Sequence, residues 1–166
     1  TPSITEFAKD ATVFDAAYDN ENWTKPSTAT ILTGLFPETH GAKEDSSKLP
    51  KGAKMISQRL KSNGFKTGAF LANGYVSDAF GFKKGWDFYT NYIREKKNTN
   101  ADKVVDDALE WIEDNKNDRF FAYLHTILLG LRGMRIEEST REIINHLDRL
   151  RKDVNRYGET FRMVGD

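Results

Sequence analysis

The sequence predicts an α/β fold: a partial, mainly parallel sheet flanked by helices and followed by a C-terminal amphipathic, coiled-coil-like helical arm. Three observations support this class. Residues 66–73 and 119–126 are apolar runs typical of buried strands. Helical patterns alternate with these runs along residues 1–127, as expected for strands joined by helical crossovers. From residue 136 onward, apolar residues recur at spacings of four and three, which is a heptad pattern.

The N-terminal part of the chain predicts two helices and a strand. Residues 1–8 are expected to form a short helix, and residues 12–18 a strand. A second helix is expected over residues 27–35, because Gly34 suits a helix end and Pro37 prevents continuation.

The middle of the chain predicts the parallel sheet and its helices. Residues 55–62 are expected to form a helix before the strand at 66–73, and residues 74–85 form a Gly- and aromatic-rich loop. A longer helix, capped by Thr99 or Asn100 and ending at Asp114, leads to the strand at 119–126. Its apolar stripe consists of Val104, Val105, Ala108 and Ile112.

Charge and cysteine content exclude several classes of function. The chain has 25 Lys and Arg against 25 Asp and Glu, so there is no basic field for nucleic acid, and no nucleic-acid partner is expected. It has no cysteine, which excludes disulfides and thiolate metal sites. No apolar run approaches the roughly 20 residues that span a bilayer, so no membrane partner is expected.

The N-terminal residues show no targeting signal. Residues 1–20 are polar and mixed in charge, unlike a signal peptide, and the default expectation is a cytoplasmic protein. The sequence does not begin with Met, so we expect that an upstream segment has been removed from it.

A boundary is expected near residue 127, between an α/β domain over 1–127 and a helical tail over 128–166. Charged residues separate the apolar positions of the tail, which include Ile143, Leu147, Leu150 and Val154. This helix either packs on its own domain or forms an arm that self-associates through residues 136–164.

Thr24 and Lys25 precede the first turn of the helix that Pro26 opens. Free amide groups and the positive end of the helix dipole therefore lie near the Thr24 hydroxyl, and an anionic group held there gains from both. A hydroxyl in that place acts as a nucleophile if a metal or a base activates it. The alternative is that Thr24, or a neighbour such as Ser27, is only a capping residue.

The segment from Asn22 to Gly41 resembles the nucleophile motif of sulfatases, a family of the alkaline phosphatase superfamily. In that motif, Cys or Ser is followed by x-Pro-Ser-Arg and, a few residues later, by Thr-Gly. Thr24 stands at the nucleophile position here, and Pro26-Ser27 and Thr33-Gly34 stand at the matching places. Further similarities follow in the family's order: Thr1-Pro2-Ser3-Ile4, Phe14 with Ala17-Tyr18, Leu35-Phe36-Pro37, His40-Gly41, Gly64-Phe65-Lys66-Thr67, Gly81-Phe82 with Gly85-Trp86-Asp87, and the strand from Phe120 to His125.

The resemblance implies a metal-dependent hydrolase that acts on an anionic ester. Thr24 is expected to be the nucleophile and a ligand of a divalent cation, Ca²⁺, Mg²⁺ or Mn²⁺. Lys25 and Ser27 are expected to bind the substrate. His125, at the end of its strand, is expected to bind the anion or to protonate the leaving group. The alternative, which the residues alone favour, is a strand-end histidine satisfied by the backbone.

Three departures from the family pattern shape these expectations. Thr24 cannot be oxidised to the formylglycine that sulfatases form from Cys or Ser, and phosphoryl-transfer relatives use Thr, so the ester is either sulfate or phosphate. Thr28 replaces the family's Arg. The acidic pair of the family's first strand would precede Thr1, and no Asp-Asn or Asp-His pair follows residue 127. We therefore expect no tight metal binding and no turnover by this chain alone.

The tail resembles a different family. Residues 128–166 are similar to the C-terminal helical part of the RmuC family of DNA-recombination proteins, without the nuclease-like core of that family. This resemblance leaves a second function open: a non-enzymatic α/β module that carries a helical arm for self-association or for binding a partner.

Overall fold

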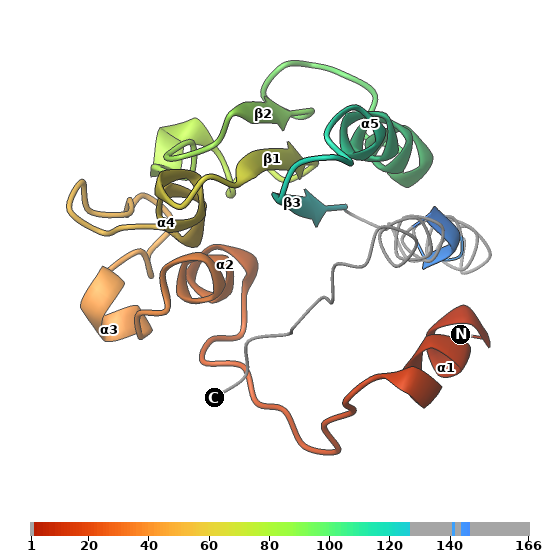
Figure 1. The fold of residues 1–166 in the computed structure, drawn as a ribbon. Coiled ribbons are helices and arrows are strands. Elements are labelled where there is room, and N and C mark those ends of the chain that lie inside the picture. Colours follow the sequence, from red (N-terminus) through yellow and green to blue (C-terminus); the bar gives the residue numbers. More distant parts are fainter. Residues whose placement is uncertain (1, 127–140, 142–143, 147–166) are drawn as a thin grey trace. The chain divides into compact units, whose positions relative to one another are not determined.

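The computed structural model describes residues 2–126, 141 and 144–146, and the chain divides into two compact units. One unit contains residues 1–13 together with the described residues 141 and 144–146; the other spans residues 14–129. Figure 1 shows the elements of both units in chain order.

The smaller unit contains helix α1 (Pro2–Phe7) and the 3₁₀ helix η1 (Ala8–Asp10). The helix predicted at residues 1–8 is thereby confirmed. Arg141 and residues 144–146 are helical. The heptad positions Ile143, Leu147, Leu150 and Val154 lie outside the described residues, so the helical arm and its self-association stay predictions.

The larger unit is built around a three-stranded parallel sheet, as the sequence predicts. Its strands are β1 (Lys66–Leu71), β2 (Phe88–Asn91) and β3 (Phe120–His125), in the order β2-β1-β3. β1 is the central strand because it pairs in parallel with both neighbours, and its last residue, Leu71, pairs with Asn91 and with His125. The carboxyl ends of all three strands therefore meet at one edge of the sheet.

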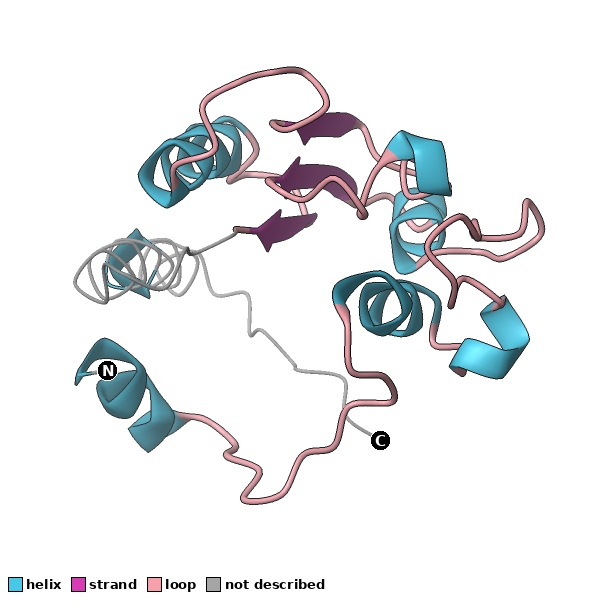
Figure 2. Cartoon of the chain, turned by 180° about the vertical axis from the view of Figure 1, so that it is seen from behind, coloured by secondary structure: helices cyan, strands magenta, loops and turns pink. Residues whose placement is uncertain are grey.

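Helices cover both faces of this sheet. On one face lie α2 (Thr24–Thr33) and α4 (Ile56–Ser62), and on the other lies α5 (Ala101–Asp114) (Figures 1 and 2). A short helix, α3 (Pro37–His40), lies between α2 and α4 in the sequence.

The two faces of β1 feed two separate hydrophobic clusters, because successive strand residues point to opposite sides. Ala69 and Leu71 pack in the cluster that includes Ala29 and Leu32 of α2. Phe70 packs with Val104 and Ala108 of α5, whose predicted stripe is buried. This alternation confirms the predicted arrangement of a sheet between helices.

One predicted strand is wrong. Residues 12–18 form neither helix nor strand, and their apolar side chains are exposed: Phe14 is 76% and Tyr18 91% exposed. Strand-like composition is not sufficient, because an extended segment needs a partner strand for its backbone groups. Three elements of the larger unit were not predicted: β2, which has only four residues, the single turn α3, where Pro37 begins a helix, and the 3₁₀ helix η2 (Asp78–Phe80).

The remaining boundaries differ by a few residues. α2 begins at Thr24, three residues before the predicted start, and ends where Gly34 adopts a left-handed conformation with φ +69°. Within the described part of the chain, the helices are too short and too polar to cross a membrane.

Candidate functional site

Helix α2 places the predicted nucleophile in its first turn. The residue before it, Trp23, is extended, so the helix begins abruptly at Thr24. Ala29 and Leu32 are buried in the core and fix the rotation of the helix. Thr24 and Thr28 are one turn apart, so their side chains lie on the same side of α2. Both line a pocket of about 520 Å³.

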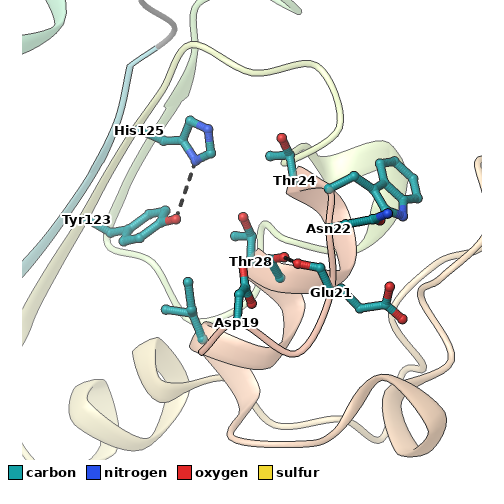
Figure 3. A pocket seen from close by; sticks show the side chains of 10 residues that line it. Asp19, Glu21, Asn22, Thr24, Thr28, Tyr123 and His125 are labelled. Carbon is teal, nitrogen blue, oxygen red and sulfur yellow. Dashed lines mark hydrogen bonds between the residues drawn. The ribbon is translucent and has the colours of Figure 1, made fainter. Parts of the chain in front are cut away.

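This pocket, called here the anion pocket, lies between the start of α2 and the end of β3. Figure 3 shows His125 and Tyr123 of β3 on one side and Thr24 on the other, with Thr28 below them. The lining residues are Asp19, Glu21, Asn22, Trp23, Thr24, Ser27, Thr28, Ile31, Tyr123 and His125. The structure therefore brings together Thr24, Ser27 and His125, three of the four residues that the sequence singles out.

His125 is held by two side chains. Its Nδ1 lies 3.4 Å from the Tyr123 hydroxyl, and its Nε2 lies 3.3 Å from the amide nitrogen of Asn73, the second residue after β1. Burial lowers the pKa of His125, so the imidazole is neutral at neutral pH. A neutral imidazole can accept a proton or share one, which is what acid–base chemistry in this pocket requires.

Tyr123 connects His125 with helix α2. Burial raises the pKa of its phenol, and the hydroxyl of Thr28 hydrogen bonds to it. Thr28 is 3% exposed, so the position where the family has Arg here carries a buried hydroxyl. The side chain at position 28 therefore brings no positive charge to the anion pocket.

Ser27 lies at the edge of the pocket and is already engaged. Its hydroxyl donates to the carbonyl oxygen of Glu21 at 3.0 Å, which ties the loop before α2 to the helix. Ser27 is thus positioned beside the pocket, and its Oγ keeps lone pairs that can accept a further hydrogen bond.

Lys25 does not lie where the sequence predicts it. Its side chain is fully buried, and its ammonium group donates to the carbonyl oxygens of three residues of one loop, at 2.5, 2.7 and 2.9 Å. Those residues are Glu44, Asp45 and Ser47. Since every ammonium proton has a partner, none is left for a substrate, and Lys25 is absent from the residues that line the anion pocket. The expectation that Lys25 binds substrate does not fit this geometry.

Lys25 is instead the anchor of the loop that follows α3. Its ammonium lies 4.3 Å from the centre of the Phe80 ring and 5.3 Å from that of Trp23, which adds cation–π contacts. Burial lowers the pKa of Lys25, although the charges of Asp45 and Glu44 oppose the shift.

A second pocket, called here the apolar pocket, also has Thr24 in its wall. It measures about 450 Å³ and is lined by Thr24, Asn73, Gly74, Tyr75, Phe80 and Ile93. Tyr75 and Ile93 are 41% and 42% exposed, and Trp23 contacts the Tyr75 ring edge-on at 5.4 Å. Thr24 thus has a polar pocket on one side and an aromatic-lined pocket on the other.

The described residues do not supply a metal site. Among them, no group of three or more His, Cys, Asp or Glu side chains converges as a ligand set. Asp19 and Glu21 line the anion pocket, but Glu21 pairs with Lys43 at 3.4 Å and Asp19 accepts a hydrogen bond from the backbone of Asn20. The sulfatase family generally uses a divalent cation, and this donor set does not fit one.

The sequence did not single out Tyr123 or Asn73. Tyr123 precedes His125 by two residues on β3, so both point to the same face, and this period is readable from the sequence. Asn73 and His125 are 52 positions apart and meet only because β1 and β3 are paired in parallel. Asn73 could have been predicted from its place just after a parallel strand, because polar residues at the carboxyl ends of such strands often line a ligand site.

Solved structures with the same fold are known, at low sequence identity. The structure of BT4656 in complex with its substrate D-glucosamine-2-N,6-O-disulfate is 21% identical, with a TM-score of 0.65 over 81% of this chain and 30% of that one. The crystal structure of Ps i-CgsB is 20% identical, with a TM-score of 0.66 over 95% of this chain and 50% of that one. Its complex with k-i-k-neocarrahexaose gives 21% identity and a TM-score of 0.62, covering 90% of this chain and 47% of that one. This chain therefore spans at most half the length of these structures.

Comparison with known families and curated proteins completes the assignment. No curated protein matches the chain. The sulfatase family model matches residues 1–128. Nothing supports the RmuC resemblance predicted for residues 128–166. Because the matched range contains the whole sheet, α2 and both pockets, the chain belongs to the sulfatase family.

Proposed function

We propose that this chain forms the nucleophile part of a sulfatase-type hydrolase for sulfate or phosphate esters of organic molecules, with Thr24 at the nucleophile position. One observation carries the proposal. Thr24 lies in the first turn of α2, in a pocket whose opposite wall holds His125 at the carboxyl end of β3. Carboxyl ends of parallel strands are where α/β enzymes place their ligands.

The start of α2 suits the anionic end of the ester. Pro26 has no N–H, and the N–H of Ser27 donates to the Trp23 carbonyl oxygen at 3.3 Å, so the amide groups of Thr24 and Lys25 are those of the first turn without a partner inside the helix. The helix dipole favours a negative charge beside them. The hydroxyl of Thr24 adds a donor there, whereas the hydroxyl of Thr28 is engaged with Tyr123. These groups replace the positive charge that neither Lys25, engaged elsewhere, nor the family's Arg provides here.

His125 is proposed to handle the proton. Because burial keeps it neutral, its imidazole can accept the proton of an attacking hydroxyl and later return it to the leaving oxygen. The hydroxyl of Tyr123, 3.4 Å from Nδ1, helps to hold the ring in place.

The apolar pocket is proposed to hold the organic part of the ester. It begins at Thr24, so an ester whose anionic group lies beside Thr24 can extend its remaining atoms over Tyr75 and Phe80. Aromatic rings with an exposed face bind the apolar faces of rings, including those of sugars.

Binding and turnover are proposed to separate in this chain. The described residues present an anion-binding start of a helix but no ligand set for a divalent cation, and a hydroxyl without such activation keeps a pKa far above neutrality. We therefore expect the 166-residue chain to bind esters without hydrolysing them.

The test measures both properties on the same protein. Binding of p-nitrophenyl sulfate, p-nitrophenyl phosphate and bis-p-nitrophenyl phosphate is measured by calorimetry, and release of p-nitrophenol is followed with and without Mn²⁺. Thr24→Val is expected to weaken binding about tenfold, since a hydrogen bond to a charged group contributes roughly 1.5–3 kcal/mol. Thr39→Val, at an exposed position of α3, is the matched control and is expected to bind like the wild type.

Each outcome decides part of the proposal. Equal binding by the Thr24→Val and Thr39→Val variants would overturn the role of Thr24. Metal-dependent turnover that disappears in Thr24→Val would support Thr24 as nucleophile and overturn the expected inactivity of the chain.

A further inference from the structure

The side-chain amide of Asn73 has a defined orientation. Its Oδ1 accepts a hydrogen bond from the backbone N–H of Tyr75 at 2.9 Å. A backbone N–H can only donate, so the oxygen must be on that side of the amide. The amide nitrogen therefore points the other way, toward Nε2 of His125 at 3.3 Å.

This orientation determines which nitrogen of His125 carries the proton. An amide NH₂ group can only donate, so Nε2 must be the acceptor and carries no proton. The proton of the neutral ring is then on Nδ1, which lies 3.4 Å from the hydroxyl oxygen of Tyr123. In this tautomer Nε2 accepts a hydrogen bond from Asn73, and Nδ1–H donates one to Tyr123.

The surroundings of His125 favour the neutral ring. Tyr123 faces it from β3 and Asn73 from the end of β1, and both are uncharged at neutral pH. The carboxylates of Asp19 and Glu21 line the same pocket, but burial is the cause that lowers the pKa of His125. A proton on Nε2 of His125 would also face the amide NH₂ group of Asn73, so two hydrogen-bond donors would point at each other.

We propose that Asn73 is a positioning residue that holds His125 as the neutral tautomer with its proton on Nδ1 and its Nε2 lone pair covered. The consequence for the reaction rests on the proposed function: His125 enters as a proton acceptor at Nε2, and only after the amide of Asn73 has moved away. In this tautomer Nε2 has no proton to give to a leaving group.

The position of Asn73 links this release to the substrate. Asn73 also lines the apolar pocket, together with Tyr75 and Phe80. An oxygen of the bound organic group can accept the amide's hydrogen bond in place of His125. Occupation of the apolar pocket would then free Nε2 at the moment when a base is needed.

A second histidine provides an internal reference. His40 is fully buried, and its Nδ1 accepts a hydrogen bond from the backbone N–H of Ala42 at 3.1 Å. Its proton must therefore be on Nε2, which lies 3.2 Å from the Thr30 hydroxyl. The fully buried His40 and the partly buried His125 thus have opposite neutral tautomers.

The tautomers are measured by long-range ¹H–¹⁵N correlation spectra of the full chain labelled with ¹⁵N-histidine. The chain has three histidines, and the variants His125→Gln and His40→Gln assign their signals. The wild type is expected to show the Nδ1–H form for His125 and the Nε2–H form for His40. An Nε2–H signal for His125 in the wild type would overturn the proposal.

Asn73→Asp is the decisive substitution, because it keeps the oxygen that Tyr75 N–H needs and replaces the donor by an acceptor. The proton of His125 is expected to move to Nε2, and the pKa of His125 to rise by about 1–3 units beside the new carboxylate. Asn22→Asp adds the same charge to the lining of the anion pocket, which His125 also lines, without a hydrogen bond to His125, and is expected to leave the tautomer unchanged.

The remaining outcomes keep this proposal separate from the proposed function. If Asn73→Asp leaves His125 as the Nδ1–H form, Asn73 does not set the tautomer. If the Asn73→Asp variant does not fold, Asn73→Ala replaces it in the test. This substitution removes both hydrogen bonds of the amide and is expected to give a mixture of His125 tautomers, so an unmixed Nδ1–H form would overturn the proposal. None of these measurements needs a ligand or turnover, so failure of ester binding leaves them valid.

Discussion

The two sides of helix α2 treat their buried polar groups differently. On the loop side, Lys25 donates to three carbonyl oxygens at 2.5–2.9 Å, so all of its donors have close partners. On the pocket side, His125 makes two contacts at 3.3 and 3.4 Å. Short, saturated contacts fix the position of a group, whereas long contacts leave it able to exchange its partner for a ligand. The comparison indicates that the loop side holds its polar groups fixed, whereas the pocket side leaves His125 able to change its hydrogen-bond partner.

The largest loss of stability is expected from disturbing the close contact between Gly85 and Gln58 of α4. This residue has φ +77°, and an added Cβ would lie 2.5 Å from the backbone nitrogen of Gln58 and 2.6 Å from its Cα. Gly85→Ala combines this clash with a strained backbone, and should lower the free energy of unfolding by about 4 kcal/mol. Urea denaturation measures the loss.

The matched control for that substitution is Gly52→Ala. An added Cβ at Gly52 meets no heavy atom within 4 Å. The free energy of unfolding should therefore change by less than about 0.5 kcal/mol. Similar losses at the two glycines would contradict the close contact between Gly85 and α4.

A smaller effect is expected from Lys25→Met, which keeps the length of the side chain and removes its donors. The carbonyl oxygens of Glu44, Asp45 and Ser47 then lose their charged donor, and the free energy of unfolding should fall by about 2 kcal/mol. Lys54→Met, at an exposed position, is the control and should change stability little. A Lys25→Met protein as stable as the control would show that the carbonyl contacts contribute no net stability.

The smallest effect concerns pH and involves two histidines, the fully buried His40 and the partly buried His125. Burial lowers the pKa of both His40 and His125 in the folded chain, below the unfolded value of 6.5. The unfolded chain therefore binds more protons as the pH falls below 6.5, and stability falls with it. Each histidine contributes at most about 1.4 kcal/mol per pH unit.

Denaturation between pH 7.5 and 5 measures this loss, since the lowered pKa values of Asp87, Glu95 and Asp107 affect stability only at more acidic pH. His125→Gln and His40→Gln should each reduce the slope of stability against pH. If neither variant changes the slope, burial does not shift these two pKa values.

Much of the fold could be predicted because its signals are local. The stripe of α5, the apolar run of β1 and the glycine that ends α2 are each readable within a few residues. β2 could not be predicted because it has four residues and ends in Thr90 and Asn91, which lack the apolar character of a strand.

The positions of site residues could be predicted where they belong to a local sequence motif. They could not be predicted where they depend on contacts between segments that are distant in the sequence. Thr24, Ser27 and His125 come together as the motif suggests. For Lys25, charge and proximity to Thr24 favoured the pocket, but the fold supplies three carbonyl oxygens on the other side of the helix. For Asn73, the partner is 52 positions away, and only the pairing of β1 with β3 brings it near.

The contacts of Lys25 have a consequence for how the sequence of this protein can evolve. The loop from Glu44 to Ser47 is held through its carbonyl oxygens, which every amino acid carries. The side chains of this loop can therefore drift among relatives, while its length and the lysine at position 25 cannot change independently. Insertions and deletions between residues 44 and 47 should be rare wherever this lysine is kept, because each of them would move at least one carbonyl oxygen away from the ammonium group of Lys25.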